Sequence, residues 1–125
     1  MSETSHSGLS QAQIAQFIEH GYIKLNGAFG GDLAAQGRDQ LWGAMGLSPD
    51  APETWKQPVV RLGFMTGKPF VDAANAPPLH ASYDALVGEG RWLEPNGLGT
   101  FPVRFPSPND PGDAGWHVDA SFGTD

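Results

Sequence analysis

The chain has 125 residues, enough for one domain of ordinary size, and carries a formal charge of −7 from 14 acidic and 7 basic residues. This charge has the wrong sign for binding a phosphate backbone or an anionic membrane surface, so we expect no nucleic acid and no membrane as a partner. The sequence has no cysteine, which excludes disulfides and thiolate metal sites, so a metal must be bound through nitrogen and oxygen.

The first eight residues are polar and lack the apolar segment of a signal peptide, and no run of 18 apolar residues occurs anywhere. We therefore expect a soluble, cytoplasmic protein. Seventeen glycines and eleven prolines predict many turns and few long regular elements. We predict a flexible N-terminus over residues 1–9 and a single folded domain over residues 10–125.

The first predicted helix has clear signals at both ends. Ser10 and Gln13 have the spacing of a capping box, and Gly21 is a typical residue at which a helix ends. Residues 22–25 then alternate between apolar and polar side chains, which predicts a short strand, and an Asn-Gly pair marks a turn after it.

Two further helices are predicted. One begins with Asp32 as its N-cap and ends at Gly46, and the other has Pro78 as its first residue and ends at Gly88. His80 falls within the last of these helices. A single histidine on a helix is more often a packing or surface residue than a metal ligand, so we interpret it in that way.

Two stretches outside the helices have strand-like patterns. Residues 58–62 form a short apolar run, and residues 98–106 alternate but contain Pro102. Because proline cannot donate a hydrogen bond to a neighbouring strand, the second stretch is predicted to be an edge or bulged strand. Trp55 lies in the proline-rich segment before the first of them and is predicted to pack onto the protein.

The pair His117 and Asp119 is the strongest candidate for chemistry. In a strand, residues two apart project from the same face, so the imidazole and carboxylate would lie side by side and Trp116 would point to the core. A histidine next to a carboxylate supplies two ligands of the facial triad that binds non-haem iron. Alone the pattern is not specific, because four histidines and fourteen acidic residues predict about 0.45 chance matches in a chain of this length. A paired surface histidine and aspartate is the alternative.

Longer stretches give this pair a context. Residues 98–106 (LGTFPVRFP), followed by residues 115–122 (GWHVDASF), resemble the segment that leads into the iron-binding strand of the phytanoyl-CoA dioxygenase family. Residues 17–25 (FIEHGYIKL) resemble the opening of that family, in which a short helix ends at a glycine and a strand follows. The resemblance covers roughly residues 10 to 122.

The resemblance implies an α+β, mainly β fold: a double-stranded β-helix (a jelly roll, cupin-like) with flanking helices. It also implies Fe(II) as the cofactor, 2-oxoglutarate as the co-substrate, and hydroxylation of a small organic substrate by dioxygen. His117 and Asp119 match the family's first two iron ligands. The family's distal histidine and the basic residue that follows it have no counterpart in the 125 residues. We therefore expect the chain to be the N-terminal part of a dioxygenase domain, an incomplete barrel that is inactive alone.

Arg104 and Arg61 are the candidates for binding 2-oxoglutarate, because a guanidinium group can bind a carboxylate through two parallel hydrogen bonds. For each arginine the alternative is a surface salt bridge on a strand. Two other functions remain open: a non-catalytic jelly-roll module for binding or interaction, and a cupin-like metal-binding protein. The sequence predicts neither the substrate nor the oligomeric state.

Overall fold

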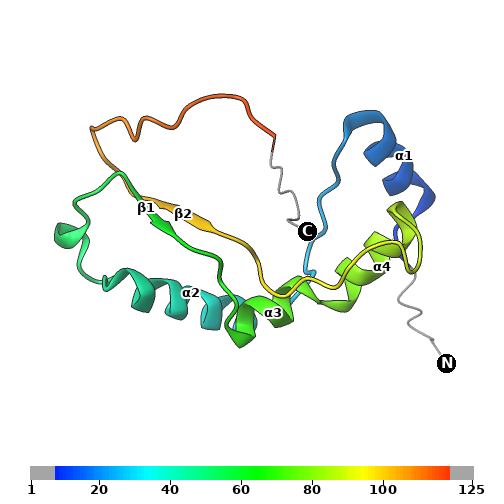
Figure 1. The fold of residues 1–125 in the computed structure, drawn as a ribbon, viewed down its shortest axis with the longest axis horizontal. Helices are drawn as coiled ribbons and strands as arrows, with labels where there is room; N and C mark the ends of the chain where they lie inside the picture. The colour runs from blue at the N-terminus through cyan, green and yellow to red at the C-terminus, as the bar shows by residue number, and fades with distance from the viewer. Residues whose placement is uncertain (1–7, 119–125) are drawn as a thin grey trace, which may run out of the picture.

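The computed structural model describes residues 8–118. The elements follow one another as α1 (Gln11–His20), α2 (Gly31–Met45), the 3-10 helix η1 (Pro52–Thr54), β1 (Val59–Leu62), α3 (Lys68–Ala74), α4 (Pro77–Leu86) and β2 (Phe101–Arg104). Figure 1 shows that α2 runs alongside the β1–β2 pair at one end of an elongated chain, and that α1 and α4 lie at the other end. No helix within residues 8–118 is long and apolar enough to cross a membrane.

β1 and β2 form an antiparallel pair in which Val59 lies opposite Arg104. The N–H of Phe105 donates to the carbonyl oxygen of Pro58 at 3.0 Å, which fixes the alternation of hydrogen-bonded and non-hydrogen-bonded positions. By that alternation the nitrogen of Pro102 lies on the outer edge of the pair, where no ladder hydrogen bond is lost. The predicted edge strand is therefore confirmed, with its proline at a position that tolerates it.

The expected mixture of helices and strands is confirmed within the described residues. The sheet there has two strands and is not closed. The jelly roll stays a prediction.

The capping signals of α1 form as expected. The hydroxyl of Ser10 accepts a hydrogen bond from the N–H of Gln13 at 3.1 Å, and the side chain of Gln13 accepts one from the N–H of Ser10 at 2.8 Å. Gly21 ends the helix with a φ of 81°, in the left-handed region that favours glycine. Local chemistry alone therefore determines both ends of this helix.

The other two predicted helices are also present, with shifted starts. α2 ends before Gly46 as predicted, but its N-cap is Gly30, and Asp32 lies instead in the first turn, where its charge complements the helix dipole. α4 begins at Pro77, one residue earlier than predicted, and ends at Leu86. These shifts are the size expected when several residues near a helix start can act as caps.

The structure differs from the sequence prediction in two places. Residues 22–25 form no strand, because a strand needs a partner and none lies beside them in the described chain. Helix α3 was not predicted, because its seven residues span too few turns to show an apolar period. Its inner face is nevertheless well packed, and Phe70 and Ala74 are buried.

Aromatic side chains hold the β1–β2 pair against the helices. This pair is called the hairpin below, although α3 and α4 lie between its two strands in the sequence. Phe70 of α3 is only 2% exposed, and its ring centre lies 5.4 Å from that of Phe101 on β2. A second cluster joins Trp42 of α2, Trp55 and Phe105, with ring centres 5.2 to 5.9 Å apart. The predicted packing of Trp55 is confirmed. These contacts place α2 and α3 on one face of the hairpin.

His80 takes the packing role that its position on a helix suggested. Its Nε2 lies 2.8 Å from Oδ1 of Asn75, and its ring packs edge-on against Trp92 with centres 4.7 Å apart. The amide of Asn75 in turn donates to the carbonyl oxygen of Pro95 at 2.7 Å. The ring therefore joins α4 to the segment before β2.

Candidate functional site

The register of the hairpin brings Arg61 and Arg104 onto the same face. Arg104 lies opposite Val59, and Arg61 comes two residues after Val59, so both arginines share a face and are diagonal neighbours. Phe101 contacts Phe70 of α3 from the other face. The two guanidinium groups therefore leave the hairpin on the side away from the helices.

A single carboxylate joins the two arginines. Arg104 donates from Nη1 to Oδ1 of Asp113 at 3.2 Å and from Nη2 to Oδ2 at 2.7 Å, which is the parallel, two-bond arrangement that guanidinium favours with carboxylate. Arg61 donates from Nη2 to Oδ2 of Asp113 at 3.2 Å. Asp113 belongs to the loop that follows β2 and arcs back over this face of the hairpin (Figure 1).

This arrangement favours the charged form of both partners. The hydrogen bond from Arg104 is the largest effect and lowers the pKa of Asp113. Burial opposes it, and the charges of Arg104 and Arg61 lower the pKa further. The hydrogen bond and the charge of Asp113 raise the pKa of Arg104. Asp113 and Arg104 are therefore both ionised at neutral pH.

Acid is expected to release Asp113 only at unusually low pH. An aspartate whose pKa is lowered on folding stabilises the folded loop above its ordinary pKa and loses that contribution as the pH falls through the lowered, folded value. NMR titration of the Asp113 carboxyl carbon should therefore give a pKa below the ordinary aspartate range. In Arg104→Ala the pKa should rise toward that range, and an unchanged value would show that the ion pair does not form in solution.

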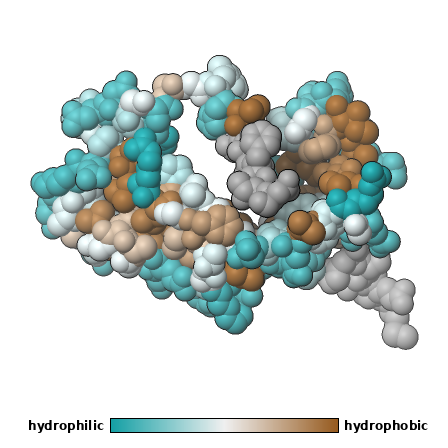
Figure 2. Space-filling view, viewed as in Figure 1, coloured by the Kyte–Doolittle hydropathy of each residue, from teal (hydrophilic) through white to brown (hydrophobic). Residues whose placement is uncertain are grey.

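His117 lies at the same cavity as the arginines. The cavity has a volume of about 410 Å³ and is lined by Arg61, Leu62, Thr100, Pro102, Arg104, Asp113 and His117. Figure 2 shows an open space between the arc of the loop and the hairpin. Apart from His117, the described lining residues that can carry charge are two arginines and one aspartate, in a chain whose formal charge is −7. The arginine pair is suited to bind an anionic group, as it binds the carboxylate of Asp113.

The local structure around His117 differs from the expected strand. Residues 115–118 lie outside any strand, and Trp116, which was predicted to point to the core, is fully exposed. The physical reason is again the lack of a neighbouring strand within the described chain. Nδ1 of His117 lies 3.4 Å from the carbonyl oxygen of Gly115, which is long for a hydrogen bond.

The second predicted iron ligand, Asp119, lies outside the described residues. Within residues 8–118, no group of three histidine, aspartate or glutamate side chains is placed to hold a metal ion. Of the four predicted site residues, the structure thus brings Arg61, Arg104 and His117 together. It adds Asp113, for which the only sequence signal was an acidic residue in a loop of proline, asparagine and glycine.

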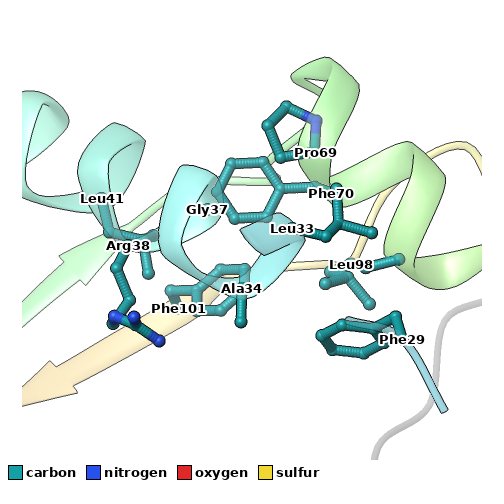
Figure 3. Close-up of a pocket in the computed structure, with 11 residues that line it drawn as sticks. Phe29, Leu33, Ala34, Gly37, Arg38, Leu41, Pro69, Phe70, Leu98 and Phe101 are labelled. Carbon is teal, nitrogen blue, oxygen red and sulfur yellow. The ribbon is translucent and has the colours of Figure 1, made fainter. Parts of the chain in front are cut away.

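A second, apolar cavity lies on the opposite face of β2. It has a volume of about 200 Å³ and lies between α2 and α3. Figure 3 shows Phe101 and Phe70 in its wall and the guanidinium group of Arg38 at its margin. Because the side chains of Phe101 and Arg104 leave β2 on opposite faces, the two cavities are separated by the hairpin. This second cavity offers no histidine or carboxylate for a metal.

No model of a protein family, no curated protein and no solved structure matches the chain.

Proposed function

We propose that the chain supplies metal-binding and co-substrate-binding residues of an Fe(II)- and 2-oxoglutarate-dependent dioxygenase of the phytanoyl-CoA dioxygenase type, which hydroxylates a small organic substrate. One observation carries the proposal: His117 and two arginines line one cavity, and the arginines are already arranged around a carboxylate. 2-Oxoglutarate presents carboxylates of the same chemistry, and planar guanidinium groups recognise them through paired hydrogen bonds.

The donor groups of these residues suit such an enzyme. In the proposal, His117 and Asp119 hold the metal together with a further ligand, and Arg61 and Arg104 bind a carboxylate of 2-oxoglutarate. An imidazole and a carboxylate are the nitrogen and oxygen ligands that Fe(II) oxygenases use, and the bound iron would supply the chemistry of dioxygen. The protein's own contribution is to hold the co-substrate beside the metal and to orient it.

The test is to add Fe(II), 2-oxoglutarate and candidate small organic substrates under air and to measure succinate. The assay is run on the 125-residue chain and on the longest polypeptide that contains it in frame. Succinate that requires both Fe(II) and 2-oxoglutarate supports the proposal. Its absence from both proteins, when both bind 2-oxoglutarate, would contradict it.

A specific observation also favours a second function, a non-catalytic module that binds carboxylates. Arg61 and Arg104 hold the carboxylate of Asp113 through their own hydrogen bonds, which is the interaction that such a module would use. The two functions differ in their dependence on metal. Carboxylate binding that is unchanged by a chelator and by added Fe(II) would favour the binding module.

A further inference from the structure

The carboxylate of Asp113 is more enclosed than the arginines that hold it. Its side chain is 26% exposed, whereas the side chains of Arg61 and Arg104 are 60% and 54% exposed. Both of its oxygens are used, and one of them accepts from both arginines. Asp113 therefore occupies the position in which a carboxylate ligand would make its best hydrogen bonds with the pair.

Asp113 is also the residue that ties its loop to the hairpin. Among residues 106–116, Asp113 accepts all the hydrogen bonds that join this stretch to β1 and β2. The other hydrogen bonds in this stretch are local: the hydroxyl of Ser107 accepts from the N–H of Asn109, and the carboxylate of Asp110 accepts from the N–H of Gly112. Displacement of the Asp113 side chain by another carboxylate would thus break the hydrogen bonds that join residues 106–116 to β1 and β2 in the described part of the chain.

We propose that Asp113 is a built-in competitor for the ligand carboxylate. It occupies the site that Arg61 and Arg104 form, and 2-oxoglutarate binds there as Asp113 leaves and residues 106–116 are released. This inference rests on the proposed function, because it takes 2-oxoglutarate as the ligand of the arginines. The inference adds regulation to co-substrate binding. When 2-oxoglutarate is absent, the same arginines hold residues 106–116 against the hairpin through Asp113.

The short chain between Arg104 and Asp113 determines how strongly Asp113 competes with a free carboxylate. Asp113 comes only nine residues after Arg104, and a group on so short a flexible link has an effective concentration on the order of millimolar. A free carboxylate with no other contacts must approach that concentration to displace it. 2-Oxoglutarate has a second carboxylate and a keto oxygen that Asp113 lacks, so additional contacts in the cavity would allow it to compete at lower concentration.

A purely structural ion pair would behave differently when Asp113 is neutralised. If Asp113 only stabilises the loop, its removal disorders one wall of the cavity and binding stays the same or weakens. If Asp113 competes with the ligand, its removal strengthens binding. The direction of the change therefore distinguishes the two roles.

The experiment compares Asp113→Asn with Asp110→Asn by calorimetric titration of 2-oxoglutarate into metal-free protein at low ionic strength. Asp110→Asn removes the same charge from the same loop but keeps an oxygen that can accept from Gly112 and touches neither arginine. We expect Asp113→Asn to bind about three- to tenfold more tightly than the unaltered protein, in line with a well-aligned but exposed ion pair. Asp110→Asn should change the affinity less than about twofold.

Hydrogen exchange supplies a second readout. The amides of residues 106–116 should exchange faster in Asp113→Asn, and saturating 2-oxoglutarate should produce the same acceleration in the unaltered protein. Equal or weaker binding by Asp113→Asn, slower exchange on addition of 2-oxoglutarate, or no binding by any of the three proteins would overturn the inference. Because these measurements need no metal, tighter binding by Asp113→Asn without succinate formation would leave the inference standing and contradict only the dioxygenase.

Discussion

Replacing Phe70 with alanine is expected to lower the free energy of unfolding by about 3 to 5 kcal/mol, the range for removing a buried aromatic side chain. Phe70 is 2% exposed, packs against Phe101 at 5.4 Å between ring centres, and lies beside Gly37 of α2. It thus joins α2, α3 and β2, and its loss would leave a cavity that small neighbours cannot fill. Urea unfolding followed by tryptophan fluorescence measures the change.

Phe64→Ala is the matched control. Phe64 lies in the irregular segment after β1 and is 54% exposed, so the same truncation removes much less buried surface. We expect a loss of about 1 kcal/mol, since the cost scales with the apolar area removed from water. Equal losses in the two variants would show that the core does not lie between α3 and the hairpin.

Replacing both Arg61 and Arg104 with alanine is expected to weaken 2-oxoglutarate binding at least about 30-fold, because each charged hydrogen bond contributes roughly 1.5 to 3 kcal/mol. The fold should persist, since both side chains are more than half exposed. Arg104→Lys keeps the charge but loses the paired hydrogen bonds, so its affinity should fall between those of the double variant and the unaltered protein. Titration calorimetry on metal-free protein gives all three affinities.

Arg38→Ala controls for charge in this comparison. Arg38 lies on α2, beside the cavity on the opposite face of the hairpin (Figure 3), so its removal changes net charge without touching the carboxylate site. We expect its affinity to remain within about twofold of the unaltered protein. If Arg38→Ala and the double variant lose affinity equally, the arginines act only through the overall charge and the proposed site is wrong.

The parts of the fold that could be predicted are those with short-range causes. The capping box at Ser10 and the stop at Gly21 depend on hydrogen bonds within a few residues, so sequence alone identifies them. Pro102 marked an edge strand because its missing donor is a property of the residue itself. The strand expected over residues 22–25 failed because strand formation depends on a partner that local patterns do not specify.

The candidate site was predicted only in part, because its assembly also depends on the pairing of strands. Arg61 and Arg104 were identified one at a time from their chemistry, but their convergence follows from the register of β1 against β2, which the sequence does not specify. Asp113 was missed because its role depends on the path of the loop, which brings it back to Arg104, nine residues earlier in the chain. Local sequence patterns do not specify that path. His117 reaches the expected neighbourhood without the expected strand.

The most direct measurement is the effect of Fe(II) on 2-oxoglutarate affinity under anaerobic conditions, in the unaltered protein and in His117→Ala. If metal and co-substrate share the cavity, saturating Fe(II) should strengthen 2-oxoglutarate binding at least about fivefold, a typical coupling between two sites. In His117→Ala the binding by Arg61 and Arg104 should persist and the effect of Fe(II) should disappear. An affinity that is the same with and without Fe(II) in the unaltered protein would contradict an iron site at His117.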